Sequence, residues 1–282
     1  MHTATVLTTM SNNIPTEAEI RTKVKGVWES GDYARFAKYL EPGALKILDS
    51  FNIKKNDKVL DVACGAGQTA IPAARKGAHV TGLDIADNLV TAARQRAEQE
   101  QLNVHFDQGD ACGLPYEDNQ FDTVFSLIGA MFAPYPQQVA KELVRVTRPG
   151  GQIHMTNWTP DGMVGEMLRT VSKYAPPPAG VAPPTLWGNE ESVLERFGDN
   201  VENIKLQRNY YPEFNYPFAP AKVADWFINY YGPTNRAYQV AGEEKQDDLR
   251  NELSEIFSRH NTSNNGSTSL KAEYLAVSAN KR

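Results

Sequence analysis

The stretch 59–67 reads Val-Leu-Asp-Val-Ala-Cys-Gly-Ala-Gly, a short apolar strand that runs directly into a glycine-rich turn. A helix-like run over 68–76 follows the turn at once. The N–H groups at the start of a helix have no partner within it, and the helix dipole favours negative charge there. Glycine suits the turn because a β-carbon would block a ligand and strain left-handed torsions. The stretch therefore predicts a cradle for an anionic or hydrogen-bonding small molecule.

Predicted strands and helices alternate along the chain after this turn. Strands are predicted over 58–63, 78–84, 103–107, 121–128 and 152–158, and the helices between them over 68–76, 86–100 and 136–147. Arg148-Pro149-Gly150-Gly151 is a strong signal that the last of these helices ends. Such alternation indicates βαβ units, so the predicted fold class is α/β, with a doubly wound, mostly parallel sheet.

The two ends of the chain and the region after Trp158 do not continue this alternation of strands and helices. Residues 1–15 are polar and predict a disordered tail, and Thr16 with Glu19 three positions later predicts a capped helix. We assign 16–158 and 268–282 to the core and 159–267 to a substrate-cap insert. Nine aromatic residues lie between 210 and 231. They form either the small core of the cap or an aromatic lid over the substrate, and both interpretations stay open.

Composition narrows the classes of partner and compartment. The net charge of −5 argues against nucleic acid, and no apolar run approaches the roughly 20 residues that span a bilayer. No secretory leader is expected at the N-terminus, so we expect a cytoplasmic protein. Cys64 and Cys112 are too few for a disulfide framework and lack metal-ligand spacing, and we expect both to be buried and inert. No metal site is predicted.

Two ligands compete for the cradle. Gly65, Gly67 and Ala70 fit the dinucleotide pattern G-x-G-x-x-[G/A], and Asp84 lies 19 positions after Gly65, which would favour NAD. Asp61, however, sits inside the strand, where a carboxylate repels pyrophosphate but suits an α-ammonium group. Asp110 follows the third strand and would accept from an exocyclic amine. Together these side chains indicate a nucleoside that carries an amino acid.

Five motifs occur in one order along the chain. They are 59–67, Gly82-Leu83-Asp84, the run 109–116, Phe121-Asp122-Thr123-Val124 and Arg148-Pro149-Gly150-Gly151. In this order they resemble the motifs of class I S-adenosylmethionine-dependent methyltransferases, and within these the small-molecule group that includes the quinone-biosynthesis enzymes. The resemblance covers about 16–158 and the terminal strand, 271–279, which it implies runs antiparallel.

The resemblance also implies which residues contact S-adenosylmethionine. The cofactor-binding residues it implies are Asp61 and Gly65 at the methionine end, Ala63 and Gly67 in the same stretch, Asp84 at the ribose, Ile85, Asp110 and Ala111 at the adenine, and Leu127 beside the sulfonium. Many members have glycine where this chain has Ala63, and a methyl group there is expected to narrow the pocket.

The chemistry leaves the catalytic residues unassigned. Methyl transfer from a sulfonium is an in-line displacement, for which positioning supplies much of the rate, and a general base is needed only for a hydroxyl or carbon acid. His154 lies mid-strand and is read first as a core histidine; His105 and His260 have no motif around them. The predicted function is methylation of a small aromatic or amphipathic molecule. The alternatives are an NAD(P)-dependent oxidoreductase and a non-catalytic, cofactor-binding regulatory protein; the acceptor atom and oligomeric state stay open.

Overall fold

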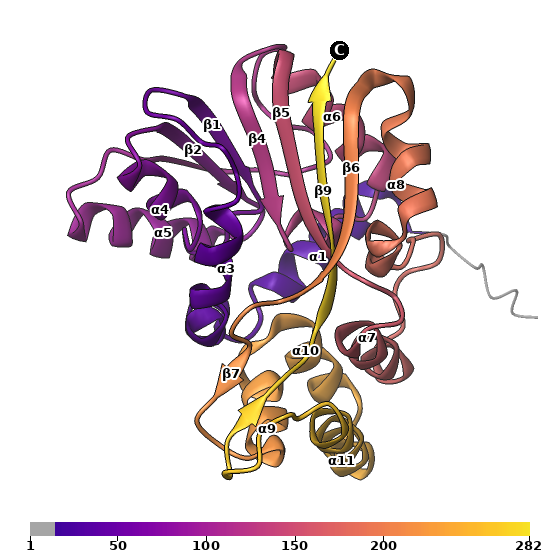
Figure 1. Cartoon of the computed structure of the whole chain (residues 1–282). Helices are drawn as coiled ribbons and strands as arrows, with labels where there is room; N and C mark the ends of the chain where they lie inside the picture. The colour runs from indigo at the N-terminus through magenta and orange to yellow at the C-terminus, as the bar shows by residue number, and fades with distance from the viewer. Residues whose placement is uncertain (1–14) are drawn as a thin grey trace, which may run out of the picture.

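A seven-stranded sheet forms the centre of the protein in a computed structural model that describes residues 15–282 (Figure 1). Its strand order is β3-β2-β1-β4-β5-β9-β6, and the strands are β1 (Lys58–Val62), β2 (His79–Asp84), β3 (His105–Gln108), β4 (Phe121–Leu127), β5 (Thr147–Trp158), β6 (Val201–Tyr210) and β9 (Glu273–Lys281). All pairs from β3 to β5 are parallel, and β9 pairs antiparallel with both β5 and β6. The predicted fold class, including the antiparallel last strand, is confirmed. The predicted tail, 1–15, lies almost wholly outside the described residues.

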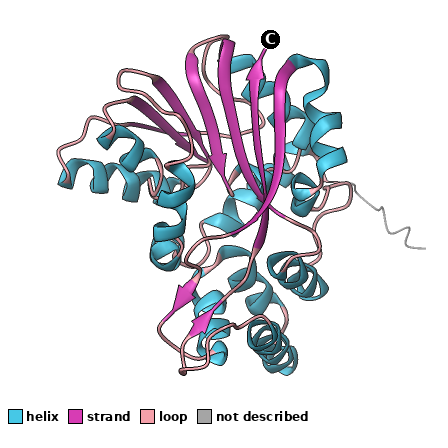
Figure 2. Ribbon diagram, viewed as in Figure 1, coloured by secondary structure: helices cyan, strands magenta, loops and turns pink. Residues whose placement is uncertain are grey.

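Helices cover both faces of this sheet, as Figure 2 shows. On one face lie α4 (Ala70–Arg75) and α5 (Asp87–Gln99), and on the other α6 (Pro136–Val146) and α8 (Glu190–Phe197). Because both faces are covered, β1 is buried throughout except at Lys58, which explains its almost continuous apolar sequence. The winding reverses between β1 and β4, so a crevice opens beyond the carboxyl ends of these two strands, where ligands bind in open α/β sheets.

Two groups of helices close this crevice. The N-terminal group is α1 (Glu17–Trp28), α2 (Tyr33–Phe36), η1 (Ala37–Tyr39) and α3 (Glu41–Leu48). The cap consists of α7 (Met163–Tyr174), α9 (Pro220–Tyr230), α10 (Gly232–Val240), α11 (Glu243–Arg259) and the ribbon of β7 (Asn215–Tyr216) and β8 (Thr268–Ser269). The short helices η2 (Ala130–Phe132), η3 (Pro184–Gly188) and η4 (Gly198–Asn200) complete the fold. In Figure 1 the cap lies below the sheet, at the end toward which the β4 arrow points.

The predicted division of the chain needs one correction. The range 159–267 was assigned as a whole to a cap, but it contains β6, which is an edge strand of the main sheet, and α8, which packs beside α6. The physical reason is pairing: β6 bonds to β9 from Val201 to Tyr210, and this ladder extends the sheet by one strand. The cap is therefore made of two separate segments that flank η3, α8 and β6.

The N-terminal helix begins as its sequence predicts. Thr16 caps α1: the Glu19 N–H donates to Thr16 Oγ1 at 3.3 Å, and the Thr16 N–H donates to Glu19 Oε2 at 2.7 Å. This reciprocal pair is a capping box, which fixes where the helix starts. None of the helices within 15–282 is long and apolar enough to cross a bilayer.

Candidate active site

The turn after β1 has the left-handed torsions that its glycines allow. Gly65 has φ +56° and Gly67 has φ +81°. A β-carbon on Gly65 would lie 3.0 Å from Gln68 Oε1 and 3.3 Å from the Tyr33 ring, and one on Gly67 would lie 3.0 Å from Ile71 Cδ1. The two glycines thus serve different purposes: Gly65 leaves room on the cavity side, whereas Gly67 lets the turn pack against α4.

Asp84 joins this turn to the end of β2. Its Oδ2 accepts the Gly65 N–H at 2.8 Å, and its Oδ1 accepts the Ala86 N–H at 3.0 Å. Burial raises the pKa of Asp84, and the backbone N–H donors partly offset that rise. Each carboxylate oxygen keeps a second lone pair, so Asp84 can accept further bonds from a ligand in the cavity whose wall it forms.

Asp61 and Gly67 do not line the cavity, and their contact with the cofactor stays a prediction. Asp61 is only 1 % exposed, and its Oδ2 accepts a bond from Thr69 Oγ1 at 2.6 Å. Its pKa is raised to about 7, mainly by burial and also by the neighbouring charge of Asp84. Asp61 thus holds the side chain of Thr69, which does line the cavity.

Asp110 lies at the end of β3 and is held from two sides. Its Oδ1 accepts the Cys112 N–H at 2.8 Å, and its Oδ2 pairs with Arg21 Nη1 of α1 at 2.5 Å. Arg21 also donates to Gln138 Oε1 at 2.9 Å, at the start of α6. Arg21 therefore ties α1 to the loop that carries Asp110, a contact between segments 89 positions apart that no motif had indicated.

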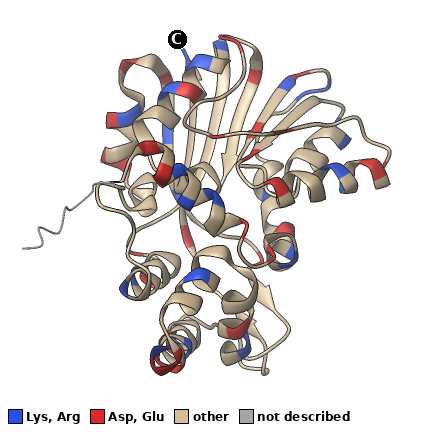
Figure 3. Ribbon diagram, turned by 180° about the vertical axis from the view of Figure 1, so that it is seen from behind, with Lys and Arg blue, Asp and Glu red and all other residues tan. Residues whose placement is uncertain are grey.

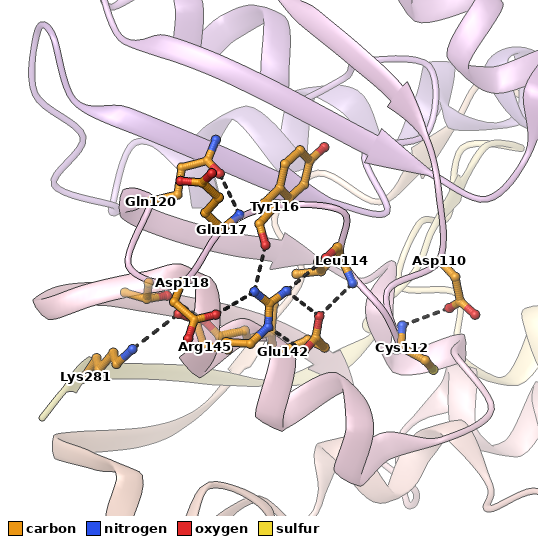
Figure 4. A network of polar contacts seen from close by, with 12 residues as sticks. Asp110, Cys112, Leu114, Tyr116, Glu117, Asp118, Gln120, Glu142, Arg145 and Lys281 are labelled. Atoms are coloured by element: carbon orange, nitrogen blue, oxygen red, sulfur yellow. Dashed lines mark hydrogen bonds and ion pairs between the residues drawn. The ribbon is translucent and has the colours of Figure 1, made fainter.

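The loop after Asp110 is anchored by one arginine, Arg145 of α6 (Figure 4). Arg145 donates to the backbone oxygens of Leu114 at 2.9 Å and Tyr116 at 2.7 Å, and it pairs with Glu142 at 2.7 Å. Glu142 in turn accepts the Leu114 N–H at 2.7 Å. The side-chain bonds to Glu142 and Asp118 raise the pKa of Arg145, so its charge is permanent. This network fixes the loop next to the adenine end implied by the sequence.

Strained backbone marks the carboxyl ends of the two central strands. Ala63 has φ +60° after β1, and Ile128 has φ +62° after β4. A β-carbon on Gly129 would lie 2.5 Å from the Ala63 oxygen, so the two turns touch and only glycine fits there. Non-glycine residues in this region persist only when their surroundings hold them, and they are common at functional sites.

One cavity connects these features with the helices that close the crevice. Seven of the nine residues implied as cofactor contacts line it: Ala63, Gly65, Asp84, Ile85, Asp110, Ala111 and Leu127. Nine of the lining residues carry aromatic rings, namely Trp28, Tyr33, Phe36, Phe132, Trp158, Tyr211, Phe214, Phe227 and Tyr231. We call these nine residues the aromatic end. No lysine, arginine or histidine within residues 15–282 lines the cavity, and its Glu41 is paired with Arg96 at 2.7 Å.

The aromatic segment 210–231 divides between the two interpretations. Tyr211, Phe214, Phe227 and Tyr231 line the cavity, whereas Tyr216, Phe218, Trp226 and Tyr230 pack with one another and with Tyr39, and Tyr210 is exposed. Trp28 of α1 and Tyr33 of α2 add rings to the cavity wall from outside this segment. Phe36, Phe132 and Trp158 also line the cavity, and they come from three separate segments, so no single stretch of the sequence indicates them.

The candidate bases and thiols lie outside the chemistry of this cavity or are inert. His154 stacks on Phe51 with ring centroids 4.4 Å apart, and burial lowers its pKa to about 4, so it is a neutral core residue. His105 pairs with Asp107 and His260 with Glu166, both away from the cavity wall. Cys64 and Cys112 are buried free thiols, and burial raises the pKa of both, that of Cys112 to about 12. Neither is a nucleophile at neutral pH.

The residues present fit S-adenosylmethionine. The glycine turn accommodates the ring of Tyr33, and carboxylates stand at the ends of β2 and β3. No cation from the described part of the chain lines the cavity to hold a pyrophosphate. Residues 59–151 match a family model described as a methyltransferase domain. The chain belongs to the class I S-adenosylmethionine-dependent methyltransferases, and S-adenosylmethionine is its cofactor. The predicted family is confirmed; the quinone-biosynthesis subgroup stays a prediction.

The relatives identify the family but do not identify the molecule that accepts the methyl group. An uncharacterized protein of Mycobacterium tuberculosis is 37% identical over 262 residues, which cover 92% of this chain and 94% of that one. The methyltransferase GfsG of Streptomyces halstedii is 35% identical over 129 residues, 45% of this chain and 46% of the relative. Phosphoethanolamine N-methyltransferase 2 of Haemonchus contortus, solved with phosphomonomethylethanolamine and S-adenosylhomocysteine, shares the fold at 18% identity. Its TM-score is 0.60, over 95% of this chain and 60% of that one.

Proposed function

We propose that this methyltransferase acts on a small, largely apolar acceptor, aromatic or amphipathic, that carries no phosphate or carboxylate. The observation that supports the proposal is the lining of the aromatic end: nine rings face the cavity, with no lysine, arginine or histidine from residues 15–282 to hold an anion. A buried anion without a partner is strongly disfavoured. Aromatic faces, by contrast, favour an apolar ring or a cationic amine.

The chain's own contribution to such a transfer is enclosure and alignment. When bound, S-adenosylmethionine supplies an electrophilic methyl group on a sulfonium whose leaving group departs neutral. Ala63, Asp84 and Asp110 would hold the cofactor at the strand ends, while the aromatic end excludes water and orients the acceptor. No histidine of the described chain lies on the wall, and two of its carboxylates are paired, Glu41 with Arg96 and Asp110 with Arg21, so the acceptor atom and any general base stay open.

The distribution of surface charge and the two free cysteines support two further proposals, a small-molecule partner and a cytoplasmic location. Figure 3 shows Lys and Arg interspersed with Asp and Glu over the face seen from behind, without the single basic stripe expected for a phosphate backbone. This favours a small-molecule partner over nucleic acid. The free thiols of Cys64 and Cys112 support a reducing compartment, the cytoplasm.

The test is a methyl-transfer screen with radiolabelled S-adenosylmethionine. Phenols, quinols and neutral amines form one arm, and phosphate- or carboxylate-bearing amines form the other. We expect turnover in the first arm only, and turnover confined to the second would contradict the proposal. If calorimetry shows that the cofactor binds while neither arm turns over, the non-catalytic alternative is favoured; binding of NADH alone would favour the oxidoreductase.

Asp84 provides a prediction at the cofactor end. The substitution Asp84→Asn removes the charge but keeps one oxygen for the Gly65 or Ala86 N–H. A charge-assisted hydrogen bond contributes about 1.5–3 kcal/mol, so we expect affinity for S-adenosylhomocysteine to fall about 10- to 100-fold by calorimetry. Asp161→Asn, at an exposed position, is the matched control and should change nothing. Unchanged affinity in Asp84→Asn would count against its role.

A further inference from the structure

Two tyrosine hydroxyls at the aromatic end have no partner within residues 15–282. Tyr33 and Tyr231 both line the cavity, and neither hydroxyl bonds to another atom of the residues that the structure describes. They differ in this from Tyr211, which also lines the cavity but donates to the Leu40 oxygen at 2.9 Å. They differ too from Tyr216, whose unpartnered hydroxyl is sealed inside the protein. The hydroxyls of Tyr33 and Tyr231, by contrast, are not sealed, and both residues form part of the cavity wall.

The two tyrosines belong to one cluster of rings. Tyr231 lies 5.8 Å from Trp28 and 4.8 Å from Phe36, measured between ring centroids, and Tyr33 lies 5.6 Å from each of the same two rings. Tyr231 is 5 % exposed, so its ring cannot turn outward to hydrate the hydroxyl without disrupting these contacts. Two hydroxyl groups are thereby held among the rings of the aromatic end.

Tyr33 also reaches the cofactor side of the cavity. Its ring is close enough to the glycine turn that a β-carbon on Gly65 would lie 3.3 Å from Cε1. Tyr33 therefore stands where the turn at the strand ends meets the aromatic end. Resting on the function proposed above, this is the place at which the accepting atom must lie, because methyl transfer requires the donor and acceptor atoms to be almost in contact.

We propose that the hydroxyls of Tyr33 and Tyr231 bind and orient the acceptor, and that they select an apolar molecule with one neutral hydrogen-bond-accepting group, such as a hydroxyl or a carbonyl, near its methylated atom. A buried hydroxyl left without a partner is unfavourable, so a ligand that supplies an acceptor is favoured over one that does not. Sites built to bond a polar group reject analogues that lack it far more strongly than apolar pockets reject size changes.

The protonation state of both residues agrees with a donor role. Burial raises the pKa of Tyr33, and Asp84 adds to the rise; burial and the nearby Tyr33 raise the pKa of Tyr231. Both phenols stay protonated throughout the physiological range, so they donate hydrogen bonds and do not remove a proton from the acceptor. They are binding and orienting residues rather than general bases.

The test compares two probes that differ by one hydroxyl. Binding of 2-naphthol and of naphthalene is measured by equilibrium dialysis in the presence of S-adenosylhomocysteine. We expect the wild-type chain to prefer 2-naphthol at least tenfold, and Tyr231→Phe and Tyr33→Phe each to reduce that preference severalfold. Tyr216→Phe, which removes the sealed hydroxyl, is the matched control and should keep the full preference.

The outcomes separate this inference from the function on which it rests. S-adenosylhomocysteine affinity, measured on every variant, reports whether the fold and the cofactor end remain intact. An equal affinity of the wild type for the two probes, binding of neither, or an unchanged preference in the double Phe variant would overturn the role of the hydroxyls alone. Failure of the wild type to bind S-adenosylhomocysteine would overturn the proposed function as well.

Discussion

At the scale of single residues, Ala63 has a backbone conformation that suits glycine, and its methyl group forms part of the cavity wall. We predict that Ala63→Gly leaves the free energy of unfolding within about 1 kcal/mol of the wild-type value. Relief of the left-handed strain, about 1–2 kcal/mol, is largely offset by the entropy of glycine, about 0.5–1 kcal/mol. Thermal and urea denaturation would check this.

The contrasting substitution is Gly65→Ala, at φ +56°. It introduces the strain instead of relieving it, and its β-carbon approaches Gln68 and Tyr33. We expect it to cost about 1–2 kcal/mol in stability and to weaken cofactor binding. If Ala63→Gly proved the more destabilising of the two, the strain assigned to Ala63 would be wrong.

Residue spacing predicted some members of the site and could not predict others. Asp84 and Asp110 follow strands whose ends meet at one edge, so their place follows from the order of the motifs. Asp61 has the same kind of motif signal, but its carboxylate is held by Thr69 beneath the turn, and only the packing reveals this. Arg21 carries no local signal, because its partner Asp110 is distant in the sequence.

At the scale of elements, two ion pairs join α1 to the sheet side of the cavity, and they differ in how exposed they are to solvent. Arg21 bonds Asp110, whose side chain is 19% exposed, and Lys25 bonds Asp87, whose side chain is 63% exposed. We predict that Arg21→Gln speeds dissociation of S-adenosylhomocysteine about three- to tenfold, because α1 loses its tie to the loop after β3. Stopped-flow dissociation measures this rate.

Lys25→Gln is the matched control on the same helix. Exposed pairs contribute little, about 0–1 kcal/mol, so the dissociation rate should change less than in Arg21→Gln. Equal rates in the two variants would show that the clamp is a general effect of charge on α1 and not a property of the Arg21–Asp110 contact.

Most elements could be predicted because their signals are local. Strands β1, β2 and β4 are apolar runs that end in turn residues, and the helices between them have their own stop signals. β6 was also predicted as a strand, but its place in the sheet was not, since it is mostly half-buried or exposed along its length. Its membership depends on β9, about 70 residues later, and pairing at that distance leaves no local trace.

At the scale of the whole molecule, Asp61 should make stability depend on pH. Its pKa is about 7 in the folded chain, above the ordinary value of 3.8, so the folded state holds a proton that the unfolded state has lost. Stability is therefore expected to fall as pH rises from about 4 to about 7, by up to roughly 1.4 kcal/mol per pH unit from this group. Asp61→Asn should remove that contribution.

The measurement is the difference in free energy of unfolding between wild type and Asp61→Asn, followed by urea denaturation from pH 4 to pH 8. Carboxylates with lowered pKa values, such as Glu142 and Asp122, make stability rise with pH, opposite to Asp61. Their contributions are the same in both proteins and cancel in the difference. The variant's relative stability should rise with pH. A difference that is flat over this range would rule out Asp61 as a titrating group.

The position of β9 has a consequence for how the chain is made. β9 lies between β5 and β6 and bonds to both, yet it is the last of the three to leave the ribosome. Until residue 281 is free, β5 and β6 have unpaired edges, and such edges invite pairing with other chains. The growing chain should therefore depend on chaperones until its final strand emerges, and chains cut short before β9 should be removed rather than fold.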